Sequence, residues 1–304
     1  MINRTLGSTG LTVSVVGLGT WQLGGEWGKQ FTPKEVSEIF DAARRNGITL
    51  IDTAECYGDH LSEKLVGQAI KADRGRWTVA TKFGHRYTTP FERAQLWSAA
   101  DVQAQLEGSL SALGIETIDL YQFHSGTITA FENDELWSML DRQKKAGKLR
   151  HVGISVASSI SHEDQVHQAR RAREVGAETL QVVYNRLQRW PEEEIFPICR
   201  QYDLGVLARV PLASGFLSGK YPEGTRFESD DFRSRKTAQE LDAMAADARK
   251  ILAEEVPQGV AMAAWALSWC LRNPAVTAVI PGCKNAEQVA QNAKAVELLR
   301  VEGR

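Results

Sequence analysis

Four side chains that can hold or move a proton follow three successive apolar segments of the chain. Asp52 ends one apolar run and Tyr57 lies five residues further on, whereas Lys82 and His124 follow the next two runs. A phenol, with an ordinary pKa of about 10, donates a proton readily at neutral pH only where a cation stabilises its anion. We therefore expect Lys82 to lower the pKa of Tyr57 and Asp52 to hold the ammonium group of Lys82 in place.

This combination of groups suits proton donation to an oxygen that gains negative charge, as a carbonyl oxygen does when hydride reaches its carbon. His124 is expected to orient and polarise that carbonyl. The four residues include neither an activated nucleophile nor a metal-binding cluster, so we expect no metal. An alternative use of Lys82 is a Schiff base with a sugar phosphate, which would make the protein a lyase.

The chain alternates short apolar segments, expected as strands, with amphipathic segments, expected as helices. The expected strands cover 16–18, 50–52, 77–82, 118–123, 151–155, 180–184, 206–209 and 278–281. The expected helices cover 33–46, 62–70, 101–113, 135–146, 162–175, 195–202, 257–271 and 286–299. Eight units favour closure into an α/β (β/α)₈ TIM barrel over the alternative, an open doubly wound sheet. The irregular segments are 84–99, 211–237 and the charged end 301–304.

Two strands around the glycine-rich turn 7–10 predict an N-terminal β-hairpin that plugs the barrel. In a barrel, the carboxyl ends of the strands meet at one mouth. The residues Asp52, Tyr57, Lys82 and His124 therefore converge there. The long loops after the third and seventh strands lie on the same face.

The composition is that of one globular domain spanning residues 1–304, with a net charge of −2. Interspersed charges of both signs give no basis for binding nucleic acid or an anionic membrane. Four cysteines without CxxC spacing, with no apolar segment long enough to span a bilayer, favour a cytoplasmic protein with reduced thiols. Glu55 is expected to be exposed, Trp21 to line a substrate pocket, and histidines other than His124 to be structural.

Several motifs, in order, resemble those of the aldo-keto reductase superfamily. Ile51-Asp52-Thr53-Ala54 with Tyr57-Gly58 resembles the family's second-strand signature, Ala80-Thr81-Lys82 its lysine strand, and Asp119 to His124 its histidine strand. The resemblance implies that Tyr57 is the general acid in reduction and the base in oxidation. It also implies an oxidoreductase acting on an aldehyde, ketone or sugar, or on an alcohol in reverse. A non-catalytic NADPH-sensing subunit, known within the same superfamily, is the alternative.

The resemblance further implies an extended nicotinamide dinucleotide held without a Rossmann fold, with NADPH preferred and NADH possible. Lys284 would bind the ribose 2′-phosphate, while Ser155 and Gln181 would hold the carboxamide and Arg209 would face the nicotinamide. The remaining cofactor-binding candidates are Trp21, Pro211, Leu212, Ser214, Gly215, Leu217, Gly219, Lys220, Gly282, Gln288, Gln291 and Asn292.

Overall fold

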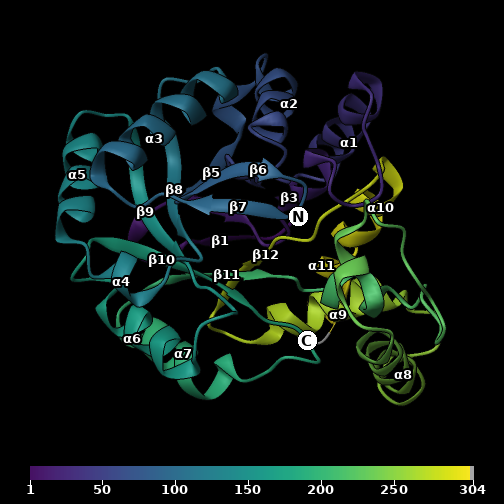
Figure 1. Ribbon diagram of the computed structural model, residues 1–304. Helices are drawn as coiled ribbons and strands as arrows, with labels where there is room; N and C mark the ends of the chain where they lie inside the picture. The colour runs from purple at the N-terminus through teal and green to yellow at the C-terminus, as the bar shows by residue number, and fades with distance from the viewer. Residues whose placement is uncertain (302–304) are drawn as a thin grey trace.

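Eight parallel strands form one curled sheet in a computed structural model that describes residues 1–301 (Figure 1). In sheet order these are β12 (Val276–Val279), β11 (Gly205–Arg209), β10 (Ala177–Val183), β9 (Leu149–Ser155), β8 (Ile118–His124), β5 (Thr78–Phe83), β4 (Leu50–Asp52) and β3 (Leu18–Gly19). Parallel bridges from Val16 to Val279 and from Gly19 to Gly282 join the two ends of the sheet. The sheet therefore closes, which confirms the (β/α)₈ prediction over the open sheet.

Helices cover the outside of the sheet (Figure 1). They are α1 (Pro33–Arg45), α2 (Leu61–Ile70), α3 (Ala99–Leu113), α4 (Ile128–Phe131), α5 (Asp134–Lys145), α6 (His162–Arg171), α7 (Pro191–Gln201), α8 (Ala238–Glu254), α9 (Met262–Arg272), α10 (Ala286–Ala293) and α11 (Ala295–Val301). Among residues 1–301, no helix combines the length and the apolar character that a bilayer span requires.

The barrel interior is closed at its amino-terminal end by the predicted hairpin, formed by β1 (Asn3–Thr5) and β2 (Thr12–Ser14). Apolar side chains from the hairpin and from five barrel strands pack there as one buried cluster: Leu6, Val13, Leu50, Ala80, Leu120, Leu207, Ala278 and Ile280. Side chains alternate along a strand, so residues two positions further on point inward as well. Four of the five next positions are polar, namely Asp52, Lys82, Gln122 and Arg209, and the fifth is Ile280. The strands therefore carry an apolar floor beneath a polar layer.

Four expected helices have bounds that differ by more than two residues. The helix expected at 162–175 ends at Arg171. The helix expected at 195–202 begins at Pro191, because proline suits the first helical position and three glutamates occupy the first turn. The helix expected at 257–271 begins at Met262, after a turn in which the Val260 amide donates to the Pro257 carbonyl. The helix expected at 286–299 is divided at Lys294 into α10 and α11.

The hairpin of β6 and β7 and the helices α4 and α8 were not predicted. The segment 84–99, expected to be irregular, contains the antiparallel hairpin β6 (His85–Thr89) and β7 (Glu92–Gln95). Helix α8 follows the irregular segment 211–237 and starts with a capping box between Thr237 and Glu240. That box was a readable signal, since it satisfies two free backbone groups at a helix start. Of the charged end 301–304, Val301 ends α11 and residues 302–304 lie outside the described part.

Close contact between α2 and α3 depends on Gly67. A Cβ atom there would lie 2.2 Å from the Leu113 carbonyl oxygen. We expect Gly67→Ala to lower the free energy of unfolding by about 1–3 kcal/mol, since the backbone of α3 must move. Gly75→Ala is the matched control, because no atom lies within 4 Å of its Cβ position. Urea unfolding that gave the two variants equal stability would contradict this account of the packing.

Candidate active site

Lys82 is the centre of the polar layer. Its Nζ donates to Asp52 Oδ1 at 2.6 Å, to the Thr53 carbonyl at 2.8 Å and to Tyr57 Oη at 3.0 Å. The Lys82 side chain is fully buried. An ammonium group has three donors, and here all three are used. The position and direction of this cation are therefore fixed by the carboxylate, the backbone and the phenol.

The second oxygen of Asp52 accepts hydrogen bonds from two buried glutamines. Gln122 Nε2 donates to Asp52 Oδ2 at 3.1 Å, and Gln181 Nε2 donates to it at 2.7 Å. Gln122 was missed in the sequence. Its signal was an amide inside the apolar strand β8, two positions before His124 and so on the same face. These bonds stabilise the ionised carboxylate that holds Lys82.

Tyr57 lies between two rings. The His124 ring meets it edge-on at a centroid distance of 6.1 Å, and Trp21 stacks on it at 5.8 Å. Trp21 is itself held by a 2.9 Å hydrogen bond from its indole Nε1 to Glu26. The four residues expected at the barrel mouth are therefore brought together in one cluster, with Trp21 beside them.

The expected lowering of the Tyr57 pKa is wrong for this structure. Burial raises the pKa of Tyr57 to about 12, although the charge of Lys82 acts in the opposite direction. Asp52 contributes to the rise, because its negative charge also disfavours the phenolate. The sequence revealed the cation but not the depth at which the phenol is buried. Tyr57 is thus held in its protonated form.

Lys82 and His124 differ in their charge at neutral pH. Burial alone would lower the pKa of Lys82, but the charge of Asp52 and the hydrogen bonds with Asp52 and Tyr57 outweigh it and the pKa is raised. Burial and the neighbouring His85 lower the pKa of His124 well below its usual value. At neutral pH the site therefore contains a charged ammonium and a neutral imidazole, so a phenol is the proton donor and an imidazole a hydrogen-bonding group.

Two residues outside the expected set lie against this cluster. Glu55, expected to be exposed, is 3% exposed, and its Oε1 accepts a hydrogen bond from the His85 amide at 3.0 Å. The His85 ring packs edge-on against His124 at 5.0 Å, with its Nε2 2.5 Å from the His124 carbonyl oxygen. The unpredicted β6 strand carries His85 to this position, which explains why the sequence alone assigned it no role.

The loop after β11, which contains the first set of cofactor candidates, has an unusual backbone. Val210, Ala213, Ser214 and Gly215 all have positive φ values between 46° and 96°. Successive residues of this kind turn backbone N–H groups toward a common point and form a concavity suited to an anion. Three of them are not glycine, so the conformation costs free energy that the surrounding structure must supply. Pro211 and Leu217 are buried in this loop, whereas Gly219 and Lys220 are exposed.

The second set of cofactor candidates follows β12. Lys284 Nζ donates to the Trp27 carbonyl and lies 3.8 Å from Asp231 Oδ2. Asp231 is bound by Arg233 at 2.6 Å, and Arg233 in turn donates to the Ser214 carbonyl at 3.3 Å. Through these contacts the two loops are joined. Arg233, which the sequence did not single out, brings a second cation close to Lys284.

The remaining candidates of the second set have partners of their own. Gln288 Oε1 accepts from the Lys284 amide at 2.8 Å, Gln291 donates to Glu287, and the buried Asn292 donates to the Cys283 sulfur. A Cβ atom on Gly282 would lie 2.0 Å from the Gln22 side chain.

Ser155, Gln181 and Arg209 lie along the rim of the barrel next to Asp52. Ser155 Oγ donates to Gln181 Oε1 at 3.3 Å, which connects the serine to the polar layer. Arg209 Nη2 donates to the Val156 carbonyl at 3.0 Å. Burial lowers the pKa of Arg209, while the negative charge of Asp52, and that of Tyr57 when the phenol is ionised, opposes that shift. A cation therefore faces the cluster from the opposite side of the barrel.

Two buried polar atoms of this region, Gln22 Oε1 and Arg209 Nε, have no hydrogen-bond partner among the described residues. Buried polar atoms without a partner are rare and call for an explanation such as a bound ligand. Their position between the tetrad and the two loops fits a polar molecule that extends from one to the other.

Residues 15–302 match the Aldo/keto reductase family. The chain belongs to this family. An uncharacterised oxidoreductase, YqkF of Bacillus subtilis, is 32% identical over 99% of this chain and 93% of its own. The holo form of aldo-keto reductase AKR11C1 from Bacillus halodurans superposes with a TM-score of 0.80 at 30% identity, covering 98% of this chain and 91% of its own. The glycerol dehydrogenase AKR11B4 from Gluconobacter oxydans superposes with a TM-score of 0.78, also at 30% identity, over 96% and 88%.

As an aldo-keto reductase, the protein is an oxidoreductase enzyme, and members of the family use nicotinamide cofactors. The residues present fit such a group: a concave backbone, cations at one end, and unpartnered polar atoms between them and the tetrad. The order of motifs along the sequence had identified the family, and both the family match and the structural neighbours confirm it.

Proposed function

We propose that this aldo-keto reductase reduces the carbonyl group of an aldehyde, ketone or sugar with NADPH, or oxidises the corresponding alcohol, and that Tyr57 is its general acid and base. One observation carries the proposal: a half-buried phenol is hydrogen-bonded to a buried ammonium group that a carboxylate fixes in place. When bound, the nicotinamide supplies or accepts the hydride. All further steps belong to side chains of this chain.

In reduction, Tyr57 Oη donates its proton to the carbonyl oxygen, which becomes the hydroxyl oxygen of the alcohol product. Lys82 stabilises the phenolate that is left, since a hydrogen bond from a cation favours the charged form. His124 is neutral and fixes the carbonyl by hydrogen bonding. In oxidation the phenolate accepts the proton of the alcohol, and the same contacts work in reverse.

Two alternatives fit the geometry less well. A Schiff-base lyase needs an unprotonated Lys82, but its pKa is raised and its three donors are all engaged. A non-catalytic cofactor-sensing subunit has no need for a complete set of Asp52, Tyr57, Lys82 and His124. The rival classes differ in their assays: borohydride trapping with a carbonyl substrate for the lyase, and cofactor binding with negligible turnover for the sensor.

The direct test follows absorbance of the nicotinamide band with a panel of aldehydes, ketones and sugars, and of alcohols that includes glycerol, with each of NADPH and NADP⁺, NADH and NAD⁺. Turnover dependent on a carbonyl or an alcohol is the expected result. Tight cofactor binding without turnover across the panel would refute the enzymatic role, and turnover of a carbonyl without nicotinamide would favour the lyase.

Preference for NADPH is proposed from the cations at the second loop. Lys284 lies near Arg233 and Lys29, and burial together with the charge of Arg233 lowers its pKa. A lysine in such a position gains most from a dianionic phosphate. We expect Lys284→Ala to weaken NADPH binding about tenfold, which equals ~1.4 kcal/mol, with little effect on NADH. The exposed Lys294→Ala is the matched control, and fluorescence titration measures both. An equal loss of affinity for NADPH and NADH would contradict the assignment of Lys284 to the 2′-phosphate.

A further inference from the structure

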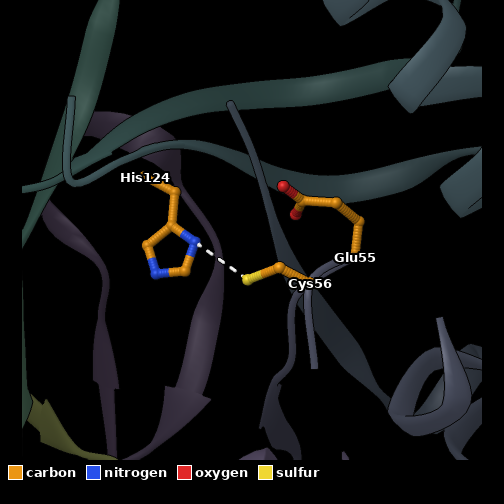
Figure 2. Close-up of side chains that lie close together, drawn as sticks. All are labelled: Glu55, Cys56 and His124. Atoms are coloured by element: carbon orange, nitrogen blue, oxygen red, sulfur yellow. Dashed lines mark hydrogen bonds between the residues drawn. The ribbon is translucent and has the colours of Figure 1, made fainter. Parts of the chain in front are cut away.

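Beside the tetrad, three side chains bring a carboxylate, a thiol and an imidazole together. The ligand atoms of Glu55, Cys56 and His124 all lie within 4.8 Å of one another. Cys56 Sγ lies 3.7 Å from His124 Nδ1. Figure 2 shows the Glu55 carboxylate turned toward the side on which the thiol and the imidazole meet. Glu55 and Cys56, in the turn after β4, thus face His124 at the end of β8.

The separation of sulfur and nitrogen fits a shared metal ion. With bonds of about 2.3 Å from zinc to sulfur and about 2.0 Å to nitrogen, tetrahedral geometry puts the two atoms ~3.6 Å apart. Sγ and Nδ1 are already at that spacing. Only the Glu55 carboxylate, whose ligand atom lies within 4.8 Å of the other two, has to approach the pair.

One oxygen of the Glu55 carboxylate is free to bind a metal ion. Glu55 is 3% exposed, and one of its oxygens, Oε1, accepts from the His85 amide. The other, Oε2, is buried and has no hydrogen-bond partner among residues 1–301. An unpaired buried polar atom costs free energy that a bound cation would recover.

We propose that Glu55, Cys56 and His124 form a binding site for one thiophilic divalent cation of the zinc type. On binding, the Cys56 S–H bond breaks, its proton and any proton on the Glu55 carboxyl group leave to solvent, and the sulfur electron pair forms the bond to the metal. The His124 Nδ1 lone pair and the Glu55 carboxylate supply two further bonds, and water takes the fourth position. No electron transfer occurs, and the metal is bound as the dication.

Three cations, Lys82, Arg93 and Arg209, lie near His124, and two of them have an anion of their own, whereas Arg209 donates to the Val156 carbonyl. Arg93 lies 2.5 Å from Glu26, and Lys82 is paired with Asp52. Bound metal at Nδ1 puts the imidazole proton on Nε2, so the ion selects a single tautomer of His124. The site itself does not depend on the proposed reductase chemistry. The expectation of no metal considered only Asp52, Tyr57, Lys82 and His124, whereas this site adds Glu55 and Cys56 to His124, and Cys56 is 68 residues from His124 in the sequence.

Cobalt(II) is the probe, because a thiolate bound to it gives a charge-transfer absorption in the near ultraviolet. Titration of the reduced protein with Co²⁺ should show this band saturating at one equivalent, and Zn²⁺ should displace it. We expect Cys56→Ser to abolish the band and to weaken Zn²⁺ binding at least ~100-fold, and Glu55→Gln to weaken it at least ~10-fold while the band is retained. Zn²⁺ affinity is measured by competition with a chromophoric chelator.

Cys199→Ser is the matched control, since Cys199 is an equally buried thiol in α7. It should keep the band and the affinity. A wild-type protein without the band, or a band unchanged in Cys56→Ser, would overturn the proposal. The Glu55→Gln variant keeps the test valid if Cys56→Ser does not fold, because unchanged Zn²⁺ affinity in it removes one of the three ligands and with it the site. Cofactor titration is independent of every one of these outcomes.

Discussion

Tyr57→Phe is expected to lose turnover by about 10³-fold or more in both directions, because a positioned proton donor contributes ~10²–10⁴-fold and no other group here replaces it. His124 cannot act instead, since its lowered pKa keeps it unprotonated at neutral pH. Phenylalanine keeps the ring contacts with Trp21 and His124, so cofactor binding should be unchanged. Steady-state rates and fluorescence titration together test this expectation.

The matched control for this variant is Tyr202→Phe, because Tyr202 is a phenol on the surface, with 36% of its area exposed. Its turnover should equal that of the wild type. If Tyr57→Phe retained most of the wild-type rate, the general acid would have to be another group, and the proposed mechanism would be wrong even though the family assignment would stand.

Lys82→Met is expected to lower alcohol oxidation by about 10²-fold or more at any pH below the pKa of Tyr57. The sign follows from the charges. Burial already raises the pKa of Tyr57 to about 12, and Lys82 is the cation that opposes the rise. Removing it destabilises the phenolate, so the pKa rises further and the basic form becomes scarcer. The rate of oxidation should therefore increase with pH in the wild type, and the increase should begin at higher pH in the variant.

Removal of this lysine also leaves Asp52 as a buried carboxylate without its cation, which costs about 3–5 kcal/mol of folding free energy. The double variant Lys82→Met with Asp52→Asn separates the two effects. It should recover stability, measured by urea unfolding, but not activity. Recovery of the oxidation rate in the double variant would mean that the charge of Lys82 acts through the fold and not on the phenol.

The protonated state of Tyr57 bears on the direction of the reaction. A phenol with a pKa near 12 is a proton donor throughout the neutral range, which suits reduction. The cationic Arg209 and Lys82 both favour the phenolate, so the site stabilises the anion that reduction leaves behind. The same phenol is a scarce base for oxidation at neutral pH.

Sequence alone determined the barrel, the hairpin plug, the family and the four residues of the tetrad. The reason is that the sequence pattern is local: apolar runs of strand length recur between amphipathic helices, and a polar residue ends or follows the runs at 50–52, 77–82 and 118–123. Once eight such units close, the carboxyl ends of the strands must share a mouth. Asp52, Lys82 and His124 then meet whatever the details of the loops.

Tertiary structure alone decided the protonation of Tyr57, the burial of Glu55 and the neighbourhood of Cys56. Residue type and spacing alone do not determine any of these three features. The pKa of Tyr57 depends on how much water the surrounding segments exclude. Burial and charge oppose each other there, and their difference is set by distances that only packing fixes. The sequence identifies the charged residues, but it does not give the depth at which each one is buried.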